Sequence, residues 1–161
     1  MKSLPFATAE VLMLAAISAC SPAADAPPTD AETVAATGAL TVNNARLVLP
    51  PVSGNPAAVY FDLSYTGAPG VTLDSVSVEG AGMTMMHDYA ESAGKAQMVM
   101  TDAVPLSANA PVSFAPGGLH VMVMEPSDAL APGSMAKITF TLSDGTTAFV
   151  DAPVRAPGDE R

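Results

Sequence analysis

The sequence has no tryptophan, few aromatic residues and a single cysteine, Cys20. One thiol cannot close an internal disulfide, and it cannot supply a zinc site built from several cysteines or a Cys-x-x-Cys redox pair. Positive charge is also scarce, with 6 Lys and Arg against 16 Asp and Glu and a formal net charge of -10. A phosphate backbone would repel such a chain, so we expect no nucleic-acid partner.

Common catalytic signatures are missing as well. The chain contains no Gly-x-Ser-x-Gly, no His-Glu-x-x-His, no phosphate-binding glycine loop and no calcium-binding loop. We therefore expect a protein that is not an enzyme. Its 161 residues, of which 49% are apolar, fit one globular domain with some additional chain.

The N-terminus resembles a secretory signal. Lys2 precedes an apolar run from Val11 to Ala19, which is shorter than the roughly 20 residues that a membrane span needs. The tetrapeptide Ile17-Ser18-Ala19-Cys20 resembles a bacterial lipobox, in which the cysteine is lipidated and becomes the first residue of the mature chain. The alternative is a buried N-terminal helix with a chance cysteine.

These features predict four segments along the chain. Residues 1–19 form a lipoprotein signal peptide, and 20–40 form the lipidated Cys20 with a flexible tether rich in Pro, Ala, Ser and Thr. Residues 41–155 form the folded domain, and 156–161 form a polar tail.

The folded domain has the pattern of an all-β protein. Apolar and polar residues alternate over 59–65 and again over 138–142, which places one face of each strand on a core. Asp144-Gly145 predicts a hairpin turn that leads into 147–150. Further strands are expected at 41–49, 71–79, 96–101, 111–114 and 119–124. The pattern predicts an antiparallel Greek-key β-sandwich of seven or eight strands.

Methionine is abundant where cysteine is scarce. Both histidines of the chain and seven of its ten methionines fall within residues 83–124. Thioether sulfur is a soft donor and imidazole a borderline one, so such a set favours Cu(I) over zinc, calcium or magnesium.

The spacing within this region predicts a shared face. On a strand at 119–124, His120, Met122 and Met124 point to one side while two valines point to the other. If the valines face the core, the histidine and methionines face outward as an accessible metal cradle. Met98 and Met100 flank Val99 in the same way on another strand.

Four of these residues are spaced as H-x10-M-x21-H-x-M, namely His87, Met98, His120 and Met122. This spacing resembles the motif of the PCu(A)C family of periplasmic copper chaperones, and Pro116-Gly117-Gly118-Leu119-His120-Val121-Met122 is similar to the family's PGG-x-H-x-M segment. The resemblance covers about residues 43–153. It implies a cupredoxin-like sandwich that carries one Cu(I) between these two histidines and two methionines.

The resemblance also implies a partner and a location. The copper would pass to the binuclear centre of cytochrome c oxidase, either directly to its copper subunit or through a thioredoxin-fold assembly protein. The protein would lie in the periplasm and touch a membrane only through its N-terminal lipid anchor. Ser21 after the lipidated cysteine favours the periplasmic face of the outer membrane.

The chain departs from the family pattern next to the first histidine. Members commonly carry an acidic residue and then Met there, whereas this chain has Asp88 and Tyr89. Additional methionines lie nearby, and we consider them candidate accessory ligands: Met85, Met86, Met100 and Met124.

Rival functions differ in their donor requirements. A blue-copper electron carrier needs a thiolate, which the mature fold lacks. A copper oxidase needs an open coordination position, which a site with four protein ligands does not leave. The remaining alternative is an envelope-anchored Ig-like structural or interaction module, whose methionines serve only in packing.

Overall fold

The computed structural model describes residues 35–92, 94–108 and 110–159. Within them every regular element is a strand, and no helix long and apolar enough to cross a membrane occurs there. The strands are β1 (Ala35–Thr37), β2 (Leu40–Val48), β3 (Ala57–Tyr65), β4 (Thr72–Val78), β5 (Met83–Ser92), β6 (Lys95–Met100), β7 (Val104–Pro105), β8 (Val112–Phe114), β9 (His120–Met124), β10 (Met135–Leu142) and β11 (Thr147–Arg155).

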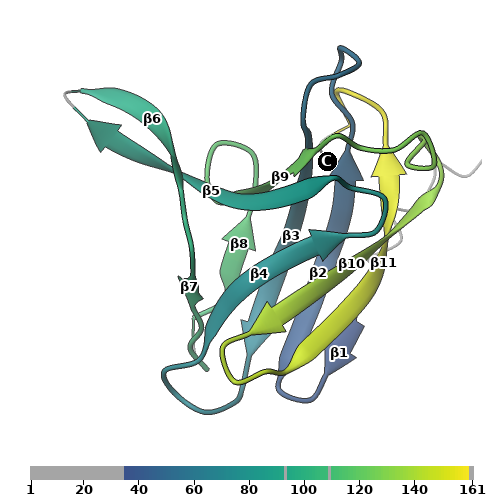
Figure 1. The fold of residues 1–161 in the computed structure, drawn as a ribbon. Helices are drawn as coiled ribbons and strands as arrows, with labels where there is room; N and C mark the ends of the chain where they lie inside the picture. The colour runs from purple at the N-terminus through teal and green to yellow at the C-terminus, as the bar shows by residue number, and fades with distance from the viewer. Residues whose placement is uncertain (1–34, 93, 109, 160–161) are drawn as a thin grey trace, which may run out of the picture. The chain divides into compact units, whose positions relative to one another are not determined.

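The strands pair in the order β6-β5-β9-β3-β2-β11-β10-β4-β7, with β1 added to β2 and β8 to β3. Figure 1 shows β4 and β10 in front of β2 and β3, which gives two layers. The all-β prediction is confirmed. One pair departs from the expected antiparallel arrangement, because the end of β11 leaves β10 and runs parallel to β2, with Val154 opposite Leu47. In this way β11 joins the two layers.

The alternating strands supply the core, as their pattern predicts. The inward-facing residues of β3, from Ala57 through Phe61 to Tyr65 at every second position, are at most 5% exposed, and Phe140 in β10 is fully buried. Phe61 stacks on Phe114 of β8 with ring centroids 4.2 Å apart, and it meets Phe140 edge-on at 4.9 Å. The contact between Phe61 and Phe140 joins the two layers, whereas Phe61 and Phe114 lie opposite each other on paired strands of one layer.

The expected hairpin is present between β10 and β11. Thr141 pairs with Thr147 across the turn, and Gly145 takes a φ of 83° that suits glycine. Asp144 stabilises the turn by accepting a hydrogen bond from the backbone N–H of Thr146, and this bond lowers the pKa of the Asp144 carboxyl.

β5 is the long strand that the sequence pattern did not reveal. Its residues Met83–Ser92 include few β-branched or aromatic side chains, and methionine occurs on both of its faces, so no simple apolar alternation marks it. The short strands β1 and β7 were also not expected. Eleven described strands therefore replace the seven or eight predicted.

The predicted segment limits can be compared with the structure only in part. The predicted signal peptide, Cys20 and the tether up to residue 34 lie outside the described residues. β1 (Ala35–Thr37) and the first residue of β2 fall inside the predicted tether 20–40, so paired backbone begins before residue 41. β11 ends at Arg155, and residues 156–159 of the predicted tail follow it without a strand.

Candidate metal centre

The two histidines meet across a pair of neighbouring strands. β5 pairs antiparallel with β9, and His87 lies opposite His120 in this ladder. The next positions along the same face pair methionine with methionine: Met85 with Met122, and Met83 with Met124. Directly opposite residues in an antiparallel pair share one face of the sheet, so side chains from both strands form one surface.

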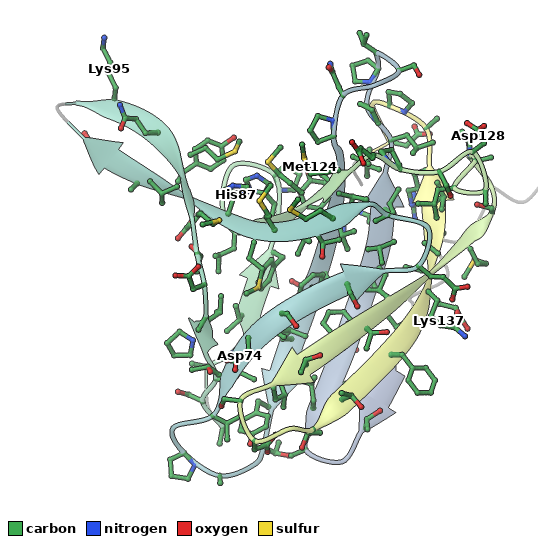
Figure 2. The ribbon with its side chains drawn as sticks, viewed as in Figure 1. Asp74, His87, Lys95, Met124, Asp128 and Lys137 are labelled. Carbon is green, nitrogen blue, oxygen red and sulfur yellow. The ribbon has the colours of Figure 1, made fainter. Side chains whose placement is uncertain are left out.

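β6 extends this surface on the other side of β5. Met100 lies opposite His87, and Met98 lies opposite Tyr89. We call the combined surface the His/Met face; it consists of Met83, Met85, His87, Tyr89, Met98, Met100, His120, Met122 and Met124. Figure 2 shows sulfur atoms gathered around the labelled His87 and Met124 on β5 and β9.

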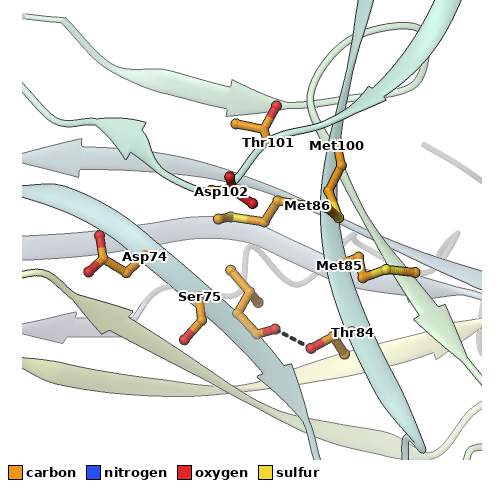
Figure 3. Close-up of a pocket in the computed structure, with 9 residues that line it drawn as sticks. Asp74, Ser75, Thr84, Met85, Met86, Met100, Thr101 and Asp102 are labelled. Carbon is orange, nitrogen blue, oxygen red and sulfur yellow. Dashed lines mark hydrogen bonds between the residues drawn. The ribbon is translucent and has the colours of Figure 1, made fainter.

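The opposite face of β5 and β9 belongs to the core. Val121 and Val123 are fully buried, as the predicted alternation requires, and Met86 is 5% exposed. Figure 3 shows Met85 and Met86 leaving β5 on opposite sides, with Met86 beside a cavity of about 170 Å³. Met86 therefore lies on the opposite face of β5 from His87, although Met85 and Met100 also line this cavity. Val99 of β6 differs from the two valines of β9, because it is 38% exposed.

His120 is less accessible than the sequence suggests. Only 6% of its surface is exposed, although Met122 and Met124 on the same face are half-buried. The rings of His87 and Tyr89 cover it, with centroids 5.8 Å and 5.7 Å from that of His120. Its Nδ1 lies 2.8 Å from the carbonyl oxygen of Gly118. A carbonyl can only accept, so Nδ1 carries the hydrogen and the neutral ring keeps Nε2 free to bind a metal.

His87 has an unsatisfied ring nitrogen. Its Nδ1 is buried and meets no hydrogen-bond partner within the described part of the chain. Burial lowers the pKa of His87 from the ordinary value of 6.5, and the charge of His120 lowers it further. Both effects favour the neutral imidazole, which is the form that binds metals. A buried nitrogen without a partner is costly unless a ligand satisfies it.

Imidazole and thioether are the donors that converge here. Among residues 35–92, 94–108 and 110–159, no group of three or more His, Cys, Asp or Glu side chains could hold a metal ion. The side chains that lie beside His87 and His120 on this face are mainly methionines, whose sulfur atoms are candidate donors. Metal–nitrogen bonds are about 2 Å long, so two rings at this separation can reach one ion. Such a neutral, soft donor set suits Cu(I).

The structure adds two residues to the site that the motif did not single out. Tyr89 lies on the His/Met face and contacts His120, and Met83 lies opposite Met124 with 58% of its surface exposed. Placing Met83, Met85, His87 and Tyr89 on a strand would have identified both, because they are spaced by two residues. Met98 and Met100 are both exposed, at 46% and 63%; Met100 lies directly opposite His87, whereas Met98 lies opposite Tyr89.

Comparisons with known proteins agree with this architecture. A family model described as putative lipoprotein LpqE-like matches residues 40–154. A protein of Rickettsia prowazekii (strain Madrid E), described as uncharacterized, is 31% identical over 99 residues. The match covers 61% of this chain and 55% of that protein, so the chain spans about half the length of this curated relative.

Two solved structures share the fold. The copper-bound PCuAC domain from PmoF2 is 23% identical, with a TM-score of 0.64 over 77% of this chain and 98% of that one. The Cu(I) form of DR1885 from Deinococcus radiodurans, solved in solution, is 26% identical, with a TM-score of 0.59 over 73% of this chain and 78% of that one.

Proposed function

The chain belongs to the LpqE-like family of putative lipoproteins, and from this premise we propose that it is a copper chaperone of the cell envelope. It binds Cu(I) as cargo through His87 and His120, with Met122 and either Met98 or Met100 as thioether ligands. The protein carries the ion rather than turning over a substrate. The observation that carries this proposal is the register of β5 and β9, which sets the two imidazoles opposite each other on a methionine-rich face.

The chemistry of the ring nitrogens supports the proposal. Nε2 of His120 is left free by the contact of Nδ1 with Gly118, and Nδ1 of His87 is buried without a partner. Bound Cu(I) would satisfy one nitrogen on each ring. The relatives of known structure supply further support, because one is a copper-bound PCuAC domain and another is a Cu(I) form.

Release follows from the same donors. Neutral imidazole and thioether ligands hold Cu(I) without a deprotonated thiol, so a partner that offers thiolates can take the ion by ligand exchange. We propose that the acceptor is the binuclear copper centre of cytochrome c oxidase or a thioredoxin-fold assembly protein that serves it. Met98 and Met100 are the most exposed of the proposed ligands, so we expect an incoming ligand to replace one of them first.

The location is part of the proposal. The lipobox-like sequence that ends at Cys20 and the family's description as lipoproteins support a periplasmic domain with a lipid anchor. Ser21 after Cys20 favours the outer membrane. Mass spectrometry of protein extracted from membranes tests this, because an unmodified Cys20 in the mature chain would contradict the anchor.

Anaerobic titration with Cu(I) in competition with a chromophoric chelator tests binding. We expect the full chain to bind Cu(I) tightly, and we expect His87→Ala to weaken this binding by more than about 100-fold, because the loss of a ligand exceeds the 10–100-fold effect typical of outer-shell changes. Met135→Leu is the matched control, because Met135 is an exposed methionine in β10, outside the His/Met face.

Transfer is tested with the loaded protein. Mixing it with the copper-free soluble domain of the oxidase subunit, or with the assembly protein, should move copper to one of them. If His87→Ala bound Cu(I) as tightly as the parent, the proposed binding site would be contradicted. If the parent bound Cu(I) tightly but passed it to neither protein, only the proposed acceptors would be contradicted.

A further inference from the structure

The His/Met face contains more sulfur than one ion needs. Two imidazoles and two thioethers complete four coordination positions around His87 and His120. Beyond them, toward the start of β5 and the end of β9, three more methionines occupy the same face: Met83, Met85 and Met124. The proposed function makes no use of these three.

Their positions bring the three sulfurs within reach of one another. Met83 and Met124 are directly opposite, so their Cβ atoms are about 4.5–5.5 Å apart. Met85 follows Met83 on the same face and lies diagonally from Met124, at a spacing of roughly 7–8 Å that long side chains bridge. Methionine has three rotatable side-chain bonds, which allow its sulfur to adjust to a ligand.

Burial in the core accounts for these methionines only in part. Met83 is 58% exposed, and Met85 and Met124 are half-buried. Met86, by contrast, lies on the opposite face of β5 in the core, where its side chain fills space between the layers. A thioether that stays partly exposed loses part of the benefit of burial, so a row of such side chains on one surface points to a role in binding.

We infer that Met83, Met85 and Met124 form a second binding site for a soft monovalent metal ion such as Cu(I), with three thioether ligands. Three soft, uncharged donors select Cu(I) over zinc, magnesium or calcium. The site lies beside the imidazole pair, and Met122 is the methionine between the two sets on β9. It requires neither histidine, so it goes beyond the proposed function.

The test counts Cu(I) equivalents in the full chain and identifies their ligands. Cu(I) is titrated anaerobically into protein labelled with carbon-13 at the methionine methyl groups, and bound metal is quantified after removal of free ion. We expect two equivalents in the parent. The methyl signals of Met83, Met85 and Met124 should all shift as one of the two Cu(I) equivalents binds. The signals of Met86 and Met135 should not shift.

Variants separate the two sites. The triple variant Met83→Leu, Met85→Leu, Met124→Leu should keep one equivalent, and its fold should be retained because exchange of Met for Leu conserves volume. Met135→Leu, whose exposed fraction equals that of Met83, should keep two equivalents. His87→Ala should lose the other equivalent while the three methyl signals still respond to Cu(I).

The outcomes distinguish this inference from the proposed function. Two equivalents in the triple variant, or methyl signals of the three residues that ignore Cu(I) in the parent, would overturn the second site. If His87→Ala still bound two equivalents of Cu(I), the imidazole site would be contradicted but the thioether site would not. The parent spectra decide the matter even if a variant fails to fold, because they report each methionine separately.

Discussion

His87 and His120 lie opposite each other, yet their surroundings differ. His120 is held by the carbonyl of Gly118, which sets its tautomer. His87 has a buried Nδ1 without a partner in the described structure, and its pKa is lowered mainly by burial and secondarily by His120. One ring is therefore oriented by the protein, and the other is kept neutral and available to a ligand.

This difference predicts how His87 titrates in the metal-free protein. Its NMR titration midpoint should lie below 6.5, and His120→Gln should raise the midpoint only in part, since burial is the larger cause. At pH values between 6.5 and the lowered pKa, His87 is protonated in a larger fraction of unfolded chains than of folded ones. The contribution of His87 to the free energy of unfolding should therefore decrease as pH falls through this interval. A midpoint at or above 6.5 would contradict the burial of the ring.

At the scale of elements, the turn before β9 determines where His120 lies. Gly118 donates its N–H to the carbonyl of Ala115 across Pro116-Gly117, and Gly117 has a φ of 84°. Proline followed by a glycine of positive φ is the pattern of a type II turn. The carbonyl of Gly118, which leaves this turn, then accepts the hydrogen bond from His120. The PGG sequence thus orients the ring two residues later.

Substitutions at Gly117 and Gly118 test how much the turn conformation contributes to stability. Gly117→Ala should reduce the free energy of unfolding by about 1–2 kcal/mol, because alanine is strained at positive φ although no atom lies within 4 Å of its added carbon. Gly118→Ala should change it by less than about 0.5 kcal/mol, because Gly118 does not have a positive φ and the nearest atom is 3.8 Å away. Chemical denaturation compares the two, and equal losses would show that backbone conformation at Gly117 is not the cause.

Across the whole described domain, stability depends on very few aromatic rings. Phe61 of β3 contacts Phe114 of β8 and Phe140 of β10, so one side chain joins both layers. Phe149 of β11 lies outside this cluster and is 64% exposed. Val121 and Val123 of β9 and Met86 of β5 belong to the same buried core, which connects the strands of the His/Met face to the rest of the domain.

Paired substitutions measure this dependence. Phe61→Ala should lower the free energy of unfolding by about 3–5 kcal/mol, because it leaves a cavity between the layers. Phe149→Ala should change it by less than about 0.5 kcal/mol, since the ring is largely in solvent already. Urea denaturation followed by circular dichroism measures both; similar losses would contradict the assignment of the core.

Sequence patterns predicted most strands, because strands with one buried face alternate strictly. The runs at 59–65 and 138–142 became β3 and β10, and the Asp144-Gly145 hairpin formed as expected. β5 was not predicted, although it carries the first histidine of the motif. Its methionines lie on both faces, so the alternation that marks a strand is hidden.

The candidate site, like the strands, was predictable from the sequence only in part. Residue type and spacing along the chain determine which donors are available and that Val121 and Val123 point away from His120, because a strand has a fixed period of two. Which donors meet was decided by tertiary structure: His87 is opposite His120, Met100 rather than Met98 is opposite His87, and Met86 is in the core. β5 and β9 are far apart in the sequence and no short turn joins them, so the residues that lie opposite each other follow from how the whole sandwich packs.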